Sequence, residues 1–188
     1  MRHKAILYSD FNCPFCYALE ERLVAQHLAG FIQWRGVQHA PELPVPMQMA
    51  NLGFSQSIER EVVTVKELMP EIDIAFPIGK PNTLKAIQYS IAASRQDPLL
   101  GMVFRHTLAR EFWVNGEDIS DESVIRSVAH QFQFDSVRVD SAAESEADRW
   151  QREWQHLGTG SVPTLVRDDG EVLLGLQPVE VLKTFFGE

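Results

Sequence analysis

Residues 5–17 read AILYSDFNCPFCY, and this stretch decides the fold. Its first four residues form a short apolar run that predicts a buried strand, and turn-forming residues follow it. From Pro14 onward, large apolar side chains recur at every fourth position, which predicts a helix that ends at Gly30. The only two cysteines of the chain, Cys13 and Cys16, therefore stand where a strand turns into a helix.

The spacing of Cys13 and Cys16 suits a reversible disulfide. Side chains three residues apart on a helix lie about 5–6 Å apart at Cβ, close to what a disulfide requires. Unpaired N–H groups and the positive end of the helix dipole favour a thiolate at Cys13. We therefore predict that Cys13 is the attacking nucleophile and Cys16 the resolving thiol. Pro14 and Phe15 supply no cation, so we expect weaker activation than in the most oxidising proteins of this kind.

Other interpretations of the two cysteines stay open but are weaker. A zinc site would need two further ligands, and no two of the six histidines have a zinc-ligand spacing, so we expect no metal. A structural disulfide across so short a loop would remove little entropy from the unfolded chain. Two buried cysteines without a chemical role would not explain why both lie where a strand turns into a helix. We expect Asp10 to cap the turn, with a role in proton transfer as the alternative.

Length and composition limit the class of protein. The chain has 188 residues, of which 45% are hydrophobic and 23% charged, as in an ordinary globular domain. With 17 basic and 26 acidic residues, its formal charge is −9, which argues against a nucleic-acid partner. Because it lacks a signal peptide and a long apolar segment, we expect no membrane association and a cytoplasmic location.

The remaining pattern predicts an α/β fold. A second strand is expected at residues 31–39, before a proline-rich break. Five apolar stripes at helical spacing come next, at residues 58–68, 84–91, 100–112, 124–132 and 143–157. Asn82 is expected to cap the second of these helices. Two strands joined by an Asp-Gly turn, at residues 161–175, and a short helix from Pro178 to about Phe186 complete a mixed sheet with an inserted helical block.

Two motifs resemble those of a known family. Residues 8–17, YSDFNCPFCY, look like the active-site turn of thioredoxin-fold proteins. The resemblance is to the DsbA-like branch, which also contains 2-hydroxychromene-2-carboxylate isomerases and kappa-class glutathione transferases. Residues 160–164, GSVPT, resemble the loop of that branch in which a cis proline faces the reactive cysteine. A weaker match, at residues 81–83, resembles the start of a helix in the inserted part of the family.

This resemblance covers nearly the whole chain. It implies one DsbA-like domain at residues 1–188, with a thioredoxin-like core at about 1–45 and 158–188 and a helical insertion at about 50–157. It also implies a thiol-disulfide oxidoreductase that acts on protein thiols or small disulfides, with glutathione as a candidate redox co-substrate and no tightly bound cofactor. The residues expected to contact substrate are Pro14, Phe15, Asn82, Val162 and Pro163.

Two other functions remain in view. In a glutathione-dependent isomerase or transferase of the same branch, residue 13 would activate bound glutathione and exchange no electrons. Such relatives typically carry serine at that position, so the pair Cys13 and Cys16 favours redox chemistry. A binding module without catalysis would tolerate replacement of Cys13 by serine. The direction of electron flow, the reduction potential and the choice between monomer and homodimer do not follow from the sequence.

Overall fold

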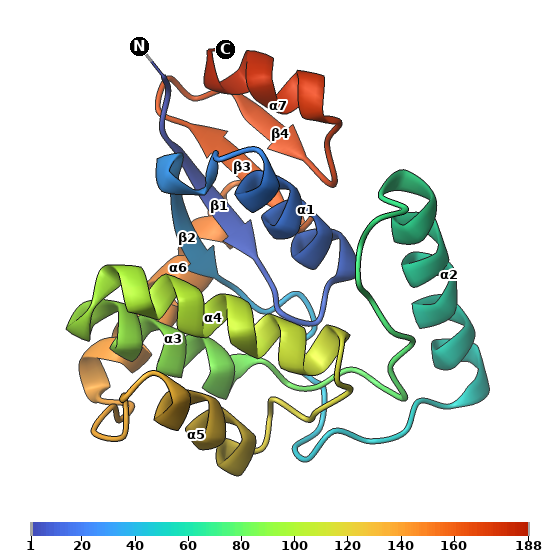
Figure 1. Ribbon diagram of the computed structural model, residues 1–188, viewed down its shortest axis with the longest axis vertical. Helices are drawn as coiled ribbons and strands as arrows, with labels where there is room; N and C mark the ends of the chain where they lie inside the picture. Colours follow the sequence, from blue (N-terminus) through green and yellow to red (C-terminus); the bar gives the residue numbers. More distant parts are fainter. Residues whose placement is uncertain (1, 188) are drawn as a thin grey trace.

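The computed structural model describes residues 2–187, and within them the chain forms a four-stranded mixed sheet surrounded by helices (Figure 1). The strands are β1 (Ala5–Ser9), β2 (Ile32–Gly36), β3 (Thr164–Arg167) and β4 (Val172–Leu174). The helices are α1 (Pro14–Ala25), the 3-10 turn η1 (Ala29–Phe31), α2 (Leu52–Leu68), α3 (Leu84–Gln96), α4 (Pro98–Trp113), α5 (Glu122–Gln131), α6 (Ser141–His156) and α7 (Val179–Phe186).

The strand order in the sheet is β2-β1-β3-β4. β1 pairs with β2 in parallel, with Ala5 opposite Ile32 and Ser9 opposite Gly36. β1 pairs with β3 in the antiparallel sense, and β3 with β4 likewise. α2 to α6 all lie in the chain between β2 and β3. The thioredoxin-like mixed sheet with a helical insertion, expected from the sequence, is therefore confirmed.

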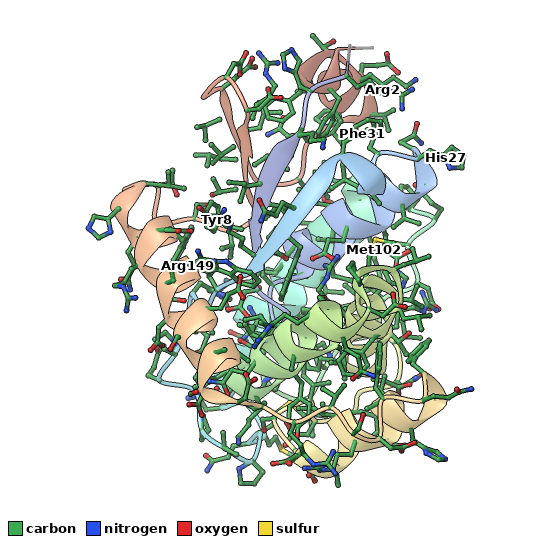
Figure 2. The ribbon with its side chains drawn as sticks, turned by 90° about the vertical axis from the view of Figure 1, so that its left-hand side faces the viewer. Arg2, Tyr8, His27, Phe31, Met102 and Arg149 are labelled. Carbon is green, nitrogen blue, oxygen red and sulfur yellow. The ribbon has the colours of Figure 1, made fainter. Side chains whose placement is uncertain are left out.

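Side chains of β1 alternate between the two faces of the sheet. Ala5 and Leu7 belong to a hydrophobic cluster with residues of α1 and α7, such as Leu19 and Phe186. Tyr8 belongs to a larger cluster that includes side chains of the helices between β2 and β3. Figure 2 shows α6 running beside the sheet on the side of Tyr8. The central strand is thus buried on both faces, as a strand in a layered α/β fold must be.

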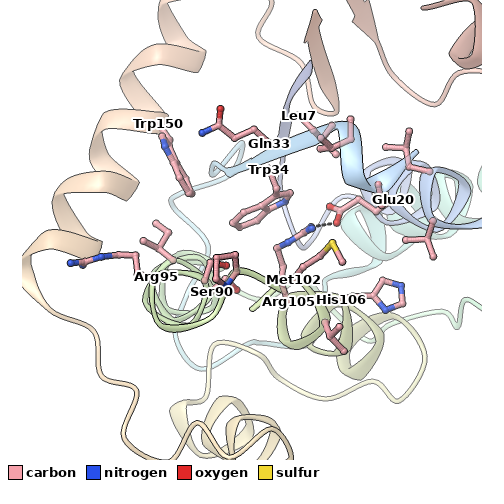
Figure 3. Close-up of a pocket in the computed structure, with 18 of the residues that line it drawn as sticks. Leu7, Glu20, Gln33, Trp34, Ser90, Arg95, Met102, Arg105, His106 and Trp150 are labelled. Carbon is pink, nitrogen blue, oxygen red and sulfur yellow. Dashed lines mark hydrogen bonds and ion pairs between the residues drawn. The ribbon is translucent and has the colours of Figure 1, made fainter. Parts of the chain in front are cut away.

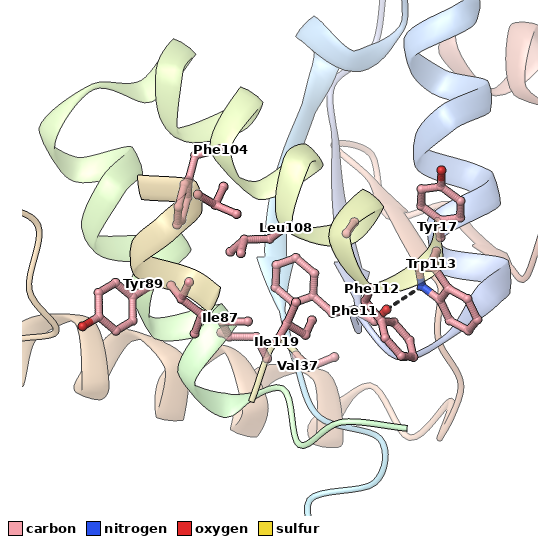
Figure 4. Close-up of a cluster of buried hydrophobic side chains, with 14 of the residues drawn as sticks. Phe11, Tyr17, Val37, Ile87, Tyr89, Phe104, Leu108, Phe112, Trp113 and Ile119 are labelled. Atoms are coloured by element: carbon pink, nitrogen blue, oxygen red, sulfur yellow. Dashed lines mark hydrogen bonds between the residues drawn. The ribbon is translucent and has the colours of Figure 1, made fainter. Parts of the chain in front are cut away.

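The inserted helices are tied to the turn that carries the cysteines. Trp113, at the end of α4, is fully buried and donates a hydrogen bond of 2.7 Å from Nε1 to the carbonyl oxygen of Phe11 (Figure 4). Its ring also stacks on Tyr17 of α1, with ring centroids 6.3 Å apart. Satisfying a buried indole N–H in this way fixes the distance between α4 and the turn.

Most boundaries agree with the sequence pattern, but the end of α1 differs. The helix was expected to continue to Gly30, and it ends at Ala25. His27 adopts a left-handed conformation with φ of 56°, and the N–H of Leu28 donates to the carbonyl of Leu23 at 2.8 Å. This is a Schellman-type helix end, normally made by glycine. Leu28 is fully buried, so packing of Leu28 has decided where the helix ends.

The second strand and the strand after residue 160 are also shorter than expected. β2 ends at Gly36, although the N–H of Val37 still donates to the carbonyl of Ser9 at 3.0 Å; two residues later, the N–H of His39 donates to the Asp10 side chain and no longer to a strand. β3 begins at Thr164 because residues 161–163 form a bend whose carbonyl at Ser161 accepts a hydrogen bond from the Thr164 hydroxyl at 2.7 Å. The expected Asp-Gly hairpin is confirmed, with Gly170 at φ of 95°.

A pair of glycine substitutions tests the packing of α3 against α4. In Gly101→Ala, the new Cβ would lie 2.5 Å from the Ser94 Cα, a backbone atom that cannot easily move. We expect a loss of about 1–3 kcal/mol of unfolding free energy, as for other overpacked sites. The matched control is Gly53→Ala in α2, where the nearest neighbour is 3.8 Å away. There we expect a gain of up to about 1 kcal/mol from helix propensity.

Urea denaturation of the two variants and the unchanged protein measures both effects. Equal stability of Gly101→Ala and Gly53→Ala would contradict the close approach of α3 and α4.

Candidate active site

Cys13 lies at the N-terminal end of α1, where the sequence predicted it. The turn after β1 is closed by a hydrogen bond of 3.2 Å from the N–H of Cys13 to the carbonyl of Asp10. Cys13 has an extended backbone, and Pro14 occupies the first helical position. The Cys13 carbonyl accepts the N–H groups of Cys16 and Tyr17 at 3.1 and 3.2 Å. Proline at this position loses no hydrogen bond, so the sequence itself sets where the helix begins.

Both thiols are free and buried. The exposed fraction is 6% for Cys13 and 1% for Cys16. The backbone N–H of Asp10 donates to the Cys16 sulfur at 3.4 Å, and the Cys13 thiol lies 3.7 Å from the carbonyl oxygen of Val162. Cys13 is therefore the sulfur that borders the loop before β3, while Cys16 lies behind it.

The environment separates the two thiols electrostatically. A hydrogen bond from the Cys16 thiol lowers the pKa of Cys13; burial opposes this, and the Cys16 N–H and the charges of His39 and Lys80 lower the pKa further. Burial raises the pKa of Cys16 well above its ordinary value, and its interactions with Cys13 raise it more. Cys13 is thus the thiol that ionises first, and the roles of nucleophile and resolving thiol stay predictions.

The sequence predicted that the Asp10 side chain caps the turn, but in the structure it does not. The carboxylate is fully buried and accepts hydrogen bonds from the Thr83 hydroxyl at 2.6 Å, the His39 N–H at 2.8 Å and the His39 Nδ1 at 2.7 Å. The expectation was wrong because partners distant in sequence satisfy this carboxylate better than its own turn does. Asp10 therefore links β1 to the segment after β2 and to the start of α3.

His39 is a titratable group near Cys13 that the sequence gave no reason to select. Burial tends to lower its pKa, but the hydrogen bond and charge of Asp10 outweigh burial and raise it. The residue before it is held by Gln151 of α6, which donates to the carbonyl of Gln38 at 2.9 Å and accepts from its N–H at 2.8 Å. The imidazole is consequently held next to the turn, and its charge favours the Cys13 thiolate.

Lys80 is a second cation near the cysteines. Its side chain is only 5% exposed, and Nζ lies 2.7 Å from a carboxylate oxygen of Glu61 on α2. Its charge lowers the pKa of Cys13. The sequence placed no cation between the cysteines, and the structure brings two from outside the turn. Neither could be chosen from the sequence, because no local pattern connects residues 39 or 80 with residue 13.

The loop before β3 faces the cysteines. Pro163 is buried, and the peptide bond between Val162 and Pro163 is cis. Trp154 of α6 donates from Nε1 to the carbonyl of Ser161 at 2.9 Å and so holds the loop in place. The carbonyl of Val162 borders the Cys13 sulfur. The structure thus brings together Cys13, Cys16, Val162 and Pro163, four of the residues selected from the sequence.

Asn82 is fully engaged by its own chain. Its oxygen accepts from Gln38 Nε2 at 3.0 Å and from the N–H of Leu84 at 3.1 Å. Its amide nitrogen donates to the carbonyls of Pro41 and Leu43 at 3.1 and 2.9 Å. The expected contact with the start of α3 is therefore present, although Thr83 is the capping residue by position. These bonds favour a positioning role, and contact of Asn82 with substrate stays a prediction.

Asn12 leaves one polar atom unpaired beside Cys13. Its amide nitrogen donates to the carbonyl of Pro81 at 2.9 Å, and the residue is 1% exposed. Within residues 2–187, its Oδ1 has no hydrogen-bond partner. Phe15, between the cysteines, is partly exposed, and Pro14 is buried. Phe15 is therefore the residue of this pair that a substrate could touch first.

In the described part of the chain, no group of three or more His, Cys, Asp or Glu side chains is placed to hold a metal ion. A search of the same residues for a helix long and apolar enough to cross a membrane found none.

The thioredoxin-like sheet, the paired thiols at a helix N-terminus and the opposing loop define a class of thioredoxin-fold proteins. A profile of the DSBA-like thioredoxin domain matches residues 5–187. The chain belongs to this family. A search of the curated proteins returned no match.

Solved structures show the same fold. A probable DsbA oxidoreductase from Streptomyces coelicolor has a TM-score of 0.75 at 19% identity, over 99% of this chain and 91% of that one. A 2-hydroxychromene-2-carboxylate isomerase has a TM-score of 0.72 at 19% identity, over 97% of this chain and 94% of that one. The cytosolic disulfide reductase DsbM from Pseudomonas aeruginosa has a TM-score of 0.66 at 14% identity, over 98% and 92%, and its structure with GSH is also similar.

Replacing His39 tests the electrostatic account of Cys13. In His39→Gln, the amide can still donate to Asp10, but the positive charge is lost, so the pKa of Cys13 should rise. We expect alkylation of Cys13 by iodoacetamide near pH 6 to slow about three- to tenfold, because less thiolate is present. The matched control is His106→Gln, which removes a histidine that pairs with Glu21 on α1.

The pH profile gives a second readout. The charge of His39 is present below its raised pKa and is lost as the pH rises through it, so the two rates should converge at higher pH. Peptide mapping by mass spectrometry follows Cys13 alone. Identical profiles for the unchanged protein and His39→Gln, or an equal effect of His106→Gln, would refute the assigned role of His39.

Proposed function

We propose that this protein is a thiol-disulfide oxidoreductase in which Cys13 attacks and Cys16 resolves. The observation that carries the proposal is the pair of free thiols at one helix N-terminus with pKa values shifted in opposite directions. A thiolate is the attacking species in disulfide exchange, and only one of the two cysteines has to be ionised for the first attack. The membership in the DSBA-like family supports redox or isomerase chemistry at this site.

The reaction follows from the two thiols. The Cys13 thiolate attacks one sulfur of a disulfide substrate, the substrate S–S bond breaks, and the departing sulfur takes up a proton. Cys16 stays protonated until this mixed disulfide has formed, because its pKa is raised. It then loses its proton and attacks the Cys13 sulfur, which releases the second substrate thiol and leaves a Cys13–Cys16 disulfide. The protein dithiol loses two electrons and the substrate disulfide gains them, and the reverse sequence oxidises a dithiol.

Substrate would bind over the surface where the loop and the helix meet. Phe15 offers a partly exposed aromatic ring at this edge, and Val162 places its carbonyl beside the reacting sulfur. Pro14 and Pro163 border the two sides of the approach to Cys13. Neither residue has a backbone N–H that could donate a hydrogen bond to substrate. We propose that Phe15 and the backbone of residue 162 contact substrate directly, with Asn82 holding the segment that carries His39.

The co-substrate and location are proposed by analogy. DsbM is described as a cytosolic disulfide reductase, and one of its structures contains GSH. We propose that glutathione exchanges with Cys13 here as well, alongside protein thiols or other small disulfides, and that the protein works in the cytoplasm. We also propose the division into a thioredoxin-like core at about residues 1–45 and 158–188 and a helical insertion at about 50–157.

The reaction of reduced protein with oxidised glutathione separates the roles of the two thiols. The unchanged protein should end with an internal disulfide and no adduct. Cys16→Ser should accumulate one glutathionyl group on Cys13, because no resolving thiol is present. Cys13→Ser should react slowly, because the remaining thiol is buried and has a raised pKa.

Intact-mass spectrometry after acid quenching distinguishes these products. If the unchanged protein stops at the glutathione adduct, the glutathione-dependent isomerase or transferase function takes the place of the proposal. If Cys13→Ser reacts as fast as the unchanged protein, Cys13 is not the nucleophile.

A further inference from the structure

The proposed reaction requires a route by which the proton of Cys16 leaves the protein. Cys16 is only 1% exposed, so water has almost no direct access to its thiol. Burial is also the main reason why the pKa of this thiol is raised, so the proton stays on the sulfur until a base accepts it. Once a substrate sulfur is joined to Cys13, bound substrate covers the side of the site on which Cys13 lies. A base inside the protein would solve this problem.

Asp10 is not placed to be this base. Its contact with the Cys16 sulfur is made by its backbone N–H, at 3.4 Å. Its carboxylate instead accepts three hydrogen bonds from Thr83 and His39. The proton of Cys16 must therefore pass to another group.

Ser9 connects Cys16 to a second carboxylate, that of Glu20. Ser9 is 2% exposed, and its side chain is a hydrogen-bond partner of the Cys16 thiol. The Ser9 hydroxyl donates to Glu20 Oε1 at 2.7 Å. Glu20 follows Cys16 by four residues on α1, so the two side chains lie on the same face of the helix. The thiol, the hydroxyl and the carboxylate thus follow one another within the protein.

Glu20 also lies at a surface that water can reach. Its second carboxylate oxygen pairs with Arg105 of α4, and Figure 3 shows this pair in the wall of a cavity of about 510 Å³. Val24 and Arg95, which line the same cavity, are exposed, so the cavity opens to solvent. Neither cysteine lines it. A proton on Glu20 can therefore reach water on a side of the molecule that substrate bound at the cysteines does not cover.

From this arrangement we infer that Ser9 and Glu20 form a proton relay between Cys16 and solvent. The inference rests on the proposed function and names two further residues for the same reaction. As Cys16 attacks the mixed disulfide, its S–H bond breaks and the proton passes to Ser9 Oγ. The Ser9 hydroxyl gives its own proton to Glu20 Oε1 in the same step.

The remaining steps balance the reaction. A new S–S bond forms between the two cysteines, and the bond between Cys13 and the substrate sulfur breaks. The substrate sulfur leaves with the electron pair of that bond and takes up a proton from solvent. Glu20 then releases its proton to water and is ready for the next cycle. Reduction of the internal disulfide runs through the same groups in reverse.

A single-turnover reaction with oxidised glutathione separates the two thiol steps. Reduced protein is quenched with acid at intervals, and intact mass counts the glutathione adduct and the internal disulfide. In Glu20→Gln we expect the adduct to form within about twofold of the normal rate, and its conversion to the internal disulfide to slow about ten- to hundredfold, as on loss of a general base. Ser9→Ala should slow the same conversion, and it tests the relay even if Glu20→Gln does not fold.

The direction of the effect distinguishes a proton acceptor from a charge. Loss of the negative charge of Glu20 would by itself favour the Cys16 thiolate and speed its attack, so only loss of proton acceptance makes this step slower. The matched control is Glu21→Gln, which removes the neighbouring carboxylate of α1, a partner of His106, and should convert the adduct at the normal rate.

A small carboxylate provides a further readout that a structural role of Glu20 would not move. Glu20→Ala leaves the position of the carboxylate open to the cavity. Formate should therefore restore part of the conversion rate in this variant, and chloride at the same concentration should not.

The relay is overturned if Glu20→Gln or Ser9→Ala converts the adduct at the normal rate or faster, if Glu21→Gln slows the conversion equally, or if formate and chloride act alike on Glu20→Ala. These outcomes leave the proposed function intact, because the internal disulfide still forms. Absence of an internal disulfide in the unchanged protein overturns the proposed function itself, and the relay with it.

Discussion

The buried carboxylate of Asp10 is the interaction on which the active-site region depends. It accepts three hydrogen bonds, one from Thr83 and two from His39, at 2.6–2.8 Å. Burial of a carboxylate away from water is strongly unfavourable unless hydrogen-bond donors surround it. The segments that carry Thr83 and His39 must therefore pack next to Asp10 in the folded chain. The Asp10 side chain therefore joins the turn before α1 to both the segment after β2 and the start of α3.

This arrangement also sets the electrostatics of the two thiols. His39 is held by Asp10 and carries its charge to higher pH than an isolated histidine would, and Lys80 adds a second cation, which is buried. Both favour a thiolate at Cys13, while Cys16 is kept neutral by burial. For the proposed dithiol–disulfide cycle, this means that the charges of His39 and Lys80 stabilise the reduced protein relative to its disulfide.

Local features of the fold could be predicted from the sequence, and features that depend on distant contacts could not. The strand, turn and helix around Cys13, the apolar stripes of α2 to α6 and the hairpin at Gly170 follow from short-range patterns. The end of α1 did not, because burial of Leu28 outweighed the glycine signal. The role of Asp10 was mistaken, and His39 and Lys80 were missed, since only tertiary structure brings them to the cysteines. The pairing of Asp10 with His39 has no signature in sequence spacing.

Equilibration of the purified protein against glutathione buffers of graded ratio, with thiols trapped and counted by mass, tests the central claim most directly. The account predicts one transition in which Cys13 and Cys16 lose both thiols together, with no lasting glutathione adduct at any ratio. The midpoint then gives the reduction potential and the direction of electron flow. A stable adduct on Cys13, or two thiols that survive in the most oxidising buffer, would contradict a dithiol–disulfide cycle at this site.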